Sequence, residues 1–218
     1  MAEVPDQSSV DTHPTRAARR SQAERSTSTQ NAILEATLAC LVEHGYAATS
    51  TSVIQKRAGV SRGALTHQFP SKSDLIVATA RYLSDLRATR LLARLADAPS
   101  EGDRTTWLLW LLWEEGFDSA LFQAAIELWT AARTVPELQA TLRESEHQLA
   151  RKQRENFALA LGNSIAQRPS FPRAYETVVQ QMRGAALLKL VRAENKTDEE
   201  FVTDCVRMFR NELNLQGI

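Results

Sequence analysis

Apolar residues recur at helical spacing along most of this chain, and no stretch alternates apolar with polar residues for long enough to predict a β-strand. Residues 33–42 show the pattern clearly, because their apolar side chains and one Thr fall at i, i+1, i+4, i+5, i+8 and i+9, on one face of a helix. Only 8 Gly and 7 Pro interrupt the 218 residues, and most of the Pro stand where helices could begin or end. The sequence therefore predicts an all-α fold of about nine helices.

The charged residues are unevenly distributed, although 26 Lys and Arg balance 26 Asp and Glu. Residues 1–15 carry three acidic residues, whereas residues 16–72 carry eight basic residues against three acidic ones, a net charge of +5. Residues 73–218 have a net charge of −2. A local basic surface on a neutral protein suits phosphate binding, so this distribution favours a nucleic-acid partner for the N-terminal part.

Residues 1–25 almost lack large apolar side chains and are rich in Ser, Thr, Gln and Arg, so we expect a disordered basic leader. Its arginines allow two interpretations: a solvated leader, which we favour, or an arm that follows phosphates or the minor groove. These arginines are Arg16, Arg19, Arg20 and Arg25.

Three features favour a cytoplasmic protein, associated with the nucleoid when it binds DNA. The first residues are acidic and polar, unlike a signal peptide. The longest apolar run, residues 107–113, is far shorter than a membrane span, so we expect no membrane partner. Cys40 and Cys205 lie far apart within apolar helical patterns, as expected of small buried side chains in a reducing compartment.

Two short predicted helices, residues 50–58 and 62–68, meet across Gly59-Val60-Ser61. This is the spacing of a helix-turn-helix, here residues 49–68, in which the second helix enters the major groove of DNA. Thr49 and Ser61 are the expected N-caps. The second helix has little apolar content, so its outer face is polar, and its Arg62 is suited to a guanine edge or a phosphate.

The predicted helix N-termini near Thr49 and Ser71 present backbone N–H groups that suit phosphates, and Lys72 adds a positive charge beside the second one. The candidate DNA-contacting residues are therefore polar, small or basic residues of this segment. They are Thr49, Ser50, Ser61, Arg62, Gly63, Thr66, His67 and Lys72.

Three strings in this region carry a family resemblance: Gly45-Tyr46-Ala47-Ala48-Thr49-Ser50, then Ala58-Gly59-Val60-Ser61-Arg62-Gly63-Ala64-Leu65, then Phe69-Pro70-Ser71-Lys72-x-Asp74-Leu75. Together they resemble the N-terminal domain of the tetracycline-repressor (TetR) family, over about residues 26–86. The family's common Tyr, which usually touches phosphate, is replaced by the shorter Thr66, and its common His by Gln68. We expect His67 to take over part of the phosphate contact.

The resemblance implies a DNA-binding domain at residues 26–86, with three helices that include the helix-turn-helix, and an effector-binding and dimerisation domain at residues 87–218. It further implies a homodimer whose recognition helices enter successive major grooves of a near-palindromic double-stranded operator, with half-sites roughly 34–36 Å apart. The expected function is a repressor that a small apolar or aromatic effector releases from DNA.

The C-terminal part offers a candidate effector pocket, because the run Trp107–Trp113 is apolar all round and all four Trp lie within residues 107–129. These aromatic side chains either pack as ordinary core or line an apolar pocket. The candidate pocket residues are Trp107, Trp110, Trp113, Phe117, Phe122, Ile126, Trp129 and Met182.

The last two predicted helices each carry an apolar stripe, and two such helices from each subunit would form a four-helix dimer interface. Ordinary packing within one chain explains part of the same pattern. The candidate dimer residues are Tyr175, Val178, Val179, Met182, Ala186, Leu190, Phe201, Val202, Cys205 and Phe209.

Three alternatives to a repressor differ in how well they fit the sequence. An enzyme is disfavoured because the four His are scattered without metal-ligand spacing and no Gly-rich phosphate loop is present, so we expect no metal and no cofactor. The remaining alternatives are a helical protein-interaction module that does not bind DNA, and a DNA-binding activator.

Overall fold

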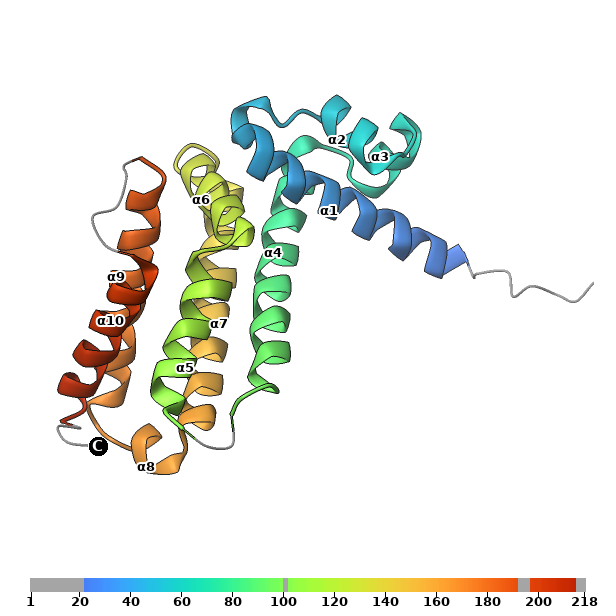
Figure 1. Ribbon diagram of the computed structural model, residues 1–218. Coiled ribbons are helices and arrows are strands. Elements are labelled where there is room, and N and C mark those ends of the chain that lie inside the picture. The colour runs from blue at the N-terminus through green and yellow to red at the C-terminus, as the bar shows by residue number, and fades with distance from the viewer. Residues whose placement is uncertain (1–21, 100–101, 192–196, 215–218) are drawn as a thin grey trace, which may run out of the picture.

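The computed structural model describes residues 22–99, 102–191 and 197–214, and these residues form helices and short turns (Figure 1). The helices of the N-terminal half are α1 (Gln22–Ala48), α2 (Thr51–Ala58), α3 (Arg62–Gln68), α4 (Lys72–Leu95) and α5 (Arg104–Leu111). A π-helical segment, η1 (Leu112–Phe117), follows, and the rest are α6 (Ala120–Ala132), α7 (Pro136–Leu161), α8 (Asn163–Ala166), α9 (Phe171–Lys189) and α10 (Asp198–Glu212). The predicted all-α class is confirmed.

Helices α1, α2 and α3 form a small N-terminal bundle with the first turn of α4 (Figure 1). Ile33 and Cys40 of α1 pack with Ile54 of α2, Leu65 of α3 and Leu75 of α4 in a single apolar cluster. The first two side chains lie on the face predicted from the sequence. Burying one apolar stripe per helix is enough to hold these short helices, which would be marginal in isolation.

Local capping residues fix the ends of the short helices. Ser50 Oγ accepts from the backbone N–H of Val53 at 3.3 Å, and Ser61 Oγ accepts from that of Ala64 at 3.1 Å. Gly59 ends α2 with φ of 66°, a left-handed conformation that glycine adopts at little cost. At the start of α4, Ser71 and Asp74 form a reciprocal capping box, as predicted.

The C-terminal body is built on α4 and α7, which pack side by side along most of their length (Figure 1). One apolar cluster joins this pair to α1 and α6, and a second cluster joins α5, η1, α9 and α10. Helix α4 contributes Leu75 to the N-terminal cluster and Leu83 to the body, so it is shared by both parts.

The α1–α6 contact ties the N-terminal bundle to the body. Gly45 interrupts α1 with φ of 73° and ψ of 171°, a region that other residues rarely adopt. The turned chain then presents the backbone N–H of Tyr46 to α6, where it donates to Glu127 Oε2 at 2.7 Å. Nearby, Leu41 packs against the apolar face of α6, in the cluster that joins α4 and α7 to α1 and α6.

The end of the leader and the number of helices differ from the predictions. The leader prediction, residues 1–25, is wrong at its end because residues 22–25 already belong to α1; residues 1–21 lie outside the described residues. Gln, Ala, Glu and Arg are good helix formers, so an exposed polar turn extends the helix without any apolar signal. The described part of the chain has ten α-helices, whereas about nine were predicted. The additional one, α8, has four residues, which is too short to show a helical period in the sequence.

Candidate nucleic-acid interface and ligand cleft

Helix α3 lies at one end of the molecule with its polar face turned outward (Figure 1). Leu65 and the following Phe69 are buried in the N-terminal cluster, which fixes the roll of this helix. That roll leaves the opposite face open, where the candidate DNA-contacting side chains of α3 are exposed. Exposed in this turn and helix are Ser61, Arg62, Gly63, Thr66 and His67.

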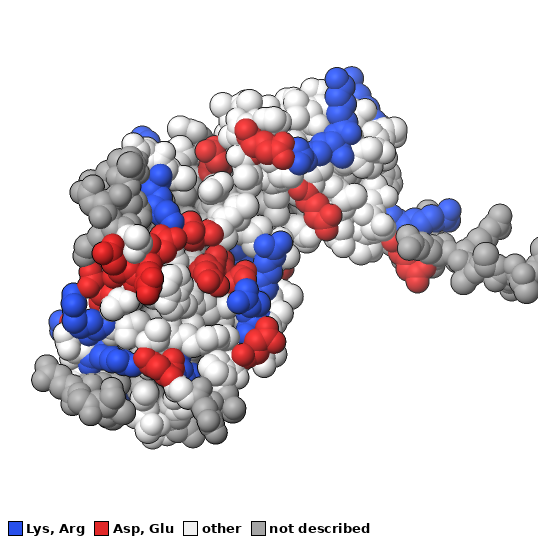
Figure 2. Space-filling view, viewed as in Figure 1, with Lys and Arg blue, Asp and Glu red and all other residues white. Residues whose placement is uncertain are grey.

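The charged residues around α3 differ in their freedom to meet a phosphate. Arg57 Nη1 and Nη2 donate to the Glu43 carboxylate at 2.5 and 2.6 Å, and this pairing raises the pKa of Arg57 and lowers that of Glu43. Lys72 lies over the Tyr46 ring, with Nζ 4.8 Å from the ring centroid. Arg62 is exposed on the open face. In Figure 2 the end formed by α2 and α3 carries blue side chains at its tip with red ones beside them, and red and blue also intermingle over the body.

Thr49 corrects one prediction about the site. Its side chain is fully buried and its hydroxyl donates to the Gly45 carbonyl at 2.7 Å, so it neither caps α2 nor faces solvent. Ser50 is the cap, and the exposed residues of the first turn are Thr51 and Ser52. The sequence Thr49-Ser50-Thr51-Ser52 offers four possible capping residues in a row, which is why the sequence alone misplaced this helix start by one position.

The predicted apolar pocket is mainly solid core. Trp113, Phe117, Phe122 and Met182 are buried in the cluster of α5, η1, α9 and α10, and Trp107, Trp110, Ile126 and Trp129 pack against it. Edge-on aromatic contacts fill the space: the Phe122 ring lies 5.3 Å from Phe117 and 5.6 Å from Trp129, measured between centroids. Of the eight predicted residues, Phe117 and Trp129 line a cleft.

That cleft lies between α7 and α9 and has a volume of about 650 Å³. Helix α7 provides one wall, helix α9 the other, and α4, η1 and α6 each contribute one residue. The α7–α9 cleft is lined by Arg87, Phe117, Trp129, Glu146, His147, Leu149, Ala150, Arg151, Gln153, Arg154, Tyr175, Glu176, Val179, Arg183 and Leu187. Most of its polar residues fell on α7, whose charged surface gave no signal of a site in the sequence.

A buried ion pair contributes to this cleft. Arg87 is 6% exposed, and its Nη1 donates to Glu146 Oε1 at 3.1 Å. Burial lowers the pKa of Arg87, Glu146 raises it, and the positive charge of Arg183 lowers it further. The Arg183 guanidinium carbon lies 5.6 Å from the centroid of the Trp129 ring. The cleft therefore combines two neighbouring guanidinium groups with one paired carboxylate.

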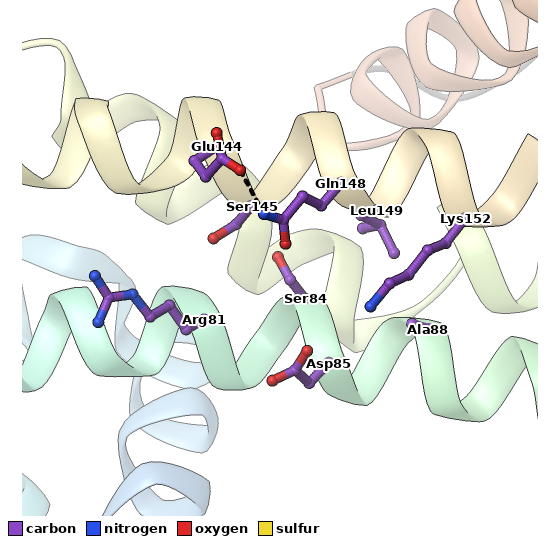
Figure 3. Close-up of a pocket in the computed structure, with 9 residues that line it drawn as sticks. All are labelled: Arg81, Ser84, Asp85, Ala88, Glu144, Ser145, Gln148, Leu149 and Lys152. Atoms are coloured by element: carbon purple, nitrogen blue, oxygen red, sulfur yellow. Dashed lines mark hydrogen bonds between the residues drawn. The ribbon is translucent and has the colours of Figure 1, made fainter.

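A second, smaller cleft of about 230 Å³ follows the outer seam between α4 and α7. Figure 3 shows Arg81, Ser84 and Asp85 on α4 opposite Glu144, Gln148 and Lys152 on α7, with Gln148 hydrogen-bonded to Glu144. Basic and acidic side chains are balanced here, and none of the predicted site residues lies in this cleft. Its lining gives no preference for the charge of a ligand.

The predicted dimer residues require a correction. Tyr175, Val178, Met182, Ala186, Val202, Cys205 and Phe209 are buried within the single chain, so they hold α9 and α10 to the body and are covered before any partner arrives. Val179 and Phe201 are half-buried, and Leu190 is 51% exposed. Four exposed apolar side chains instead lie together at the end of α9, Leu187, Leu188, Leu190 and Val191, while Leu92 and Leu159 are exposed on α4 and α7.

An outward-facing polar helix in a helix-turn-helix, joined to an all-helical body with a cleft, defines a class: helical transcriptional regulators. Residues 33–79 match the profile of the family described as "Bacterial regulatory proteins, tetR family". The similarity to this family therefore covers the N-terminal segment that contains the helix-turn-helix. The family is one of regulators rather than of enzymes.

Relatives support this assignment over different lengths. HTH-type transcriptional regulator CymR of Pseudomonas putida is 44% identical over 85 residues, which are 39% of this chain and 42% of CymR. The uncharacterized HTH-type transcriptional regulator Rv2912c of Mycobacterium tuberculosis is 28% identical over 183 residues, covering 83% of this chain and 92% of that protein. The match to CymR thus spans less than half of its length.

A solved structure shows the same fold over most of the chain. A protein from Saccharomonospora viridis, determined in complex with choline, superposes with a TM-score of 0.66 at 15% identity, covering 85% of this chain and 96% of the other.

Within the described ranges, none of the helices is both long enough and apolar enough to cross a membrane.

Proposed function

We propose that this protein is a ligand-responsive repressor that binds a near-palindromic operator as a homodimer. The observation that carries the proposal is the position of α3: Leu65 and Phe69 anchor it in the core, and its polar face lies in solvent at the end of the molecule. A short helix held in this way fits the recognition helix of a helix-turn-helix, with side chains small enough for close approach to the major groove.

The proposed DNA contacts divide into base and phosphate contacts. Arg62 is the candidate for reading a base edge, because a guanidinium can donate two hydrogen bonds to guanine. Ser50, Ser61, Gly63, Thr66, His67 and Lys72 are the candidates for positioning on phosphates and sugars. Thr49 is removed from this set because it is buried, and the exposed Thr51 and Ser52 are added.

The proposed division of labour assigns residues 26–86 to DNA binding and residues 87–218 to effector binding and dimerisation. Helix α4 crosses the boundary, so a change in the body can reach the N-terminal bundle through one continuous element. The exposed apolar end of α9 is the proposed centre of the dimer contact. We place the protein in the cytoplasm, since its DNA target lies there.

Selection of bound sequences from random double-stranded DNA tests the proposal directly. We expect an enriched near-palindrome, with binding that weakens steeply as salt rises because phosphate contacts release counterions. Light scattering should give twice the mass of the chain in solution, and Leu190→Asp should shift that mass toward the monomer. Failure to enrich any sequence at low salt would leave only an interaction module. A reporter gene under the selected operator separates repression from activation.

A further inference from the structure

We propose that the α7–α9 cleft binds an anionic amphipathic effector: a carboxylate, or a similar planar monoanion, attached to an apolar or aromatic body. This inference rests on the proposed function, because it names the chemical class of the small molecule to which the regulator responds. It revises the expectation of a purely apolar effector.

The first argument is a concentration of unpaired donors. Five buried side-chain atoms lack a hydrogen-bond partner within the described residues, and three of them belong to residues that line this cleft. They are Arg87 Nε, Arg183 Nε and Trp129 Nε1. All three are N–H groups that can donate but never accept, and buried polar groups are rarely left unpaired. The protein itself covers all three atoms, so an accepting ligand in the cleft would reach them only after these side chains turn toward it.

The second argument is charge. The residues lining the cleft include four arginines, Arg87, Arg151, Arg154 and Arg183, against two carboxylates, Glu146 and Glu176. Glu146 is already paired with the buried Arg87. Among the described residues, Arg183 forms a hydrogen bond with Gln180 and no ion pair with a carboxylate. After burial and Glu146, the positive charge of Arg183 is a further influence on the pKa of Arg87, and it acts in the lowering direction. A negative group between the two guanidinium groups would oppose that influence.

The third argument concerns which nitrogen atoms of each guanidinium group have no hydrogen-bond partner. Arg87 uses Nη1 for Glu146, and Arg183 uses Nη1 for Gln180 Oε1 at 3.3 Å, so the Nε edge of both groups lacks a partner. Nε–H and its neighbouring Nη–H form the fork that matches the two oxygens of a carboxylate. Burial raises the pKa of Tyr175, which keeps a neutral phenol in the same lining.

The fourth argument concerns the rest of the ligand. Phe117, Trp129, Val179 and Leu187 supply an apolar wall beside the arginines. A volume of about 650 Å³ lies within the range of ordinary small-molecule sites. A ligand whose apolar or aromatic part packs against this wall, and whose charged end lies at Arg87 and Arg183, would contact both the apolar and the basic residues of the cleft. A cation of the same size would meet the excess positive charge of the lining.

The test uses three probes that share one body: 2-naphthoate, 2-naphthamide and 2-naphthylmethylammonium. Calorimetric titration of the full chain, without DNA, should show 2-naphthoate binding at least about tenfold more tightly than the amide, with the ammonium compound weaker still. Equal or tighter binding of the amide, preference for the ammonium compound, or no binding of 2-naphthoate overturns the proposal.

Variants locate the binding in this cleft. Arg183→Met should abolish most of the difference between the carboxylate and the amide. Trp129→Phe, which removes the indole N–H and leaves a smaller ring, should reduce it. Arg143→Met is the matched control, because Arg143 lies on α7, is exposed and does not line the cleft. A carboxylate preference that survives both cleft variants, each confirmed as folded by its melting curve, places the anion elsewhere and overturns the assignment.

These outcomes are separable from failure of the proposed function. Titration without DNA reports only the ligand site, and selection of an operator reports only DNA binding. Operator binding without any carboxylate preference defeats the anion proposal alone. A carboxylate preference in a protein that binds no DNA defeats the repressor proposal and leaves the anion site standing.

Discussion

At the scale of single residues, the interface depends on which side chains the α3 roll leaves outside. Arg62 is the exposed residue on this face with the reach and charge to read a base edge. We predict that Arg62→Ala weakens operator binding by roughly 1–3 kcal/mol if it reads a base. Fluorescence anisotropy at fixed salt measures the change, with Arg143→Ala as the exposed arginine control. Unchanged affinity would remove Arg62 from the contacts.

A second residue-scale prediction concerns the two thiols. Cys205 is 2% exposed and burial raises its pKa to about 11, while Cys40 is fully buried and its pKa is also raised, mainly by burial. A raised pKa leaves very little thiolate at pH 8, so we expect a disulfide reagent to react slowly with the native protein and quickly in urea. Rapid native labelling of both thiols would show that this part of the core opens.

Residue identity alone predicted much of this detail, and it failed where several good candidates stood together. Ser61 and the Ser71–Asp74 capping box were found at their positions because few neighbours competed for those roles. Thr49 was chosen over Ser50 because both are good caps, and only the fold buries one of them. Capping preference ranks residue types, but it does not tell which of two adjacent residues tertiary packing covers.

At the scale of elements, the junction between α1 and α6 depends on one glycine. Gly45 has φ of 73° and ψ of 171°, and a Cβ there would come within 3.2 Å of Glu127 Oε2, the atom that accepts from Tyr46 N. We predict that Gly45→Ala lowers the free energy of unfolding by roughly 1–3 kcal/mol, since this backbone region is nearly exclusive to glycine. Urea unfolding followed by circular dichroism measures it.

The matched control for that variant is Gly184→Ala in α9. Gly184 lies within a regular helix, and a Cβ there would meet nothing within 4 Å. The same substitution should therefore stabilise the protein, by roughly 0.5–1 kcal/mol. A Gly45→Ala protein as stable as the wild type would mean that the turn adopts another conformation in solution.

The sequence predicted long elements better than short or irregular ones. Helix α7 was predicted from its N-terminal Pro136 to the Gly that follows Leu161, because the apolar period and both end signals agree. The sequence predicted a fifth helix over about residues 103–115, so the first residues of the π-helical segment η1 were expected to continue it as an ordinary α-helix. A change from one helical hydrogen-bond pattern to another leaves no clear trace in periodicity.

At the scale of the whole molecule, the sequence correctly predicted which faces of α9 and α10 are apolar, but not which elements cover those faces. The stripes of α9 and α10 were predicted to meet another subunit, whereas most of their residues are covered by α5, η1 and α7 of the same chain. The aromatic column of residues 107–129 is likewise mainly core. Periodicity shows that a face is buried, but tertiary packing decides what buries it, so the cleft appeared only once α7 and α9 were placed.

The complete regulator should show reciprocal coupling between its two sites. Trp129 lines the α7–α9 cleft, so 2-naphthoate binding should quench Trp fluorescence. If the protein is a ligand-responsive repressor as proposed, the same binding should weaken operator binding. Linkage requires that operator DNA weaken 2-naphthoate binding by the same factor, which for coupled sites is typically about 5–150-fold. Anisotropy of labelled operator at increasing 2-naphthoate gives one factor, and calorimetry with and without operator gives the other. Arg143→Met should return the wild-type factor in both. Quenching that leaves the operator affinity unchanged would show that the cleft binds the carboxylate without controlling α3.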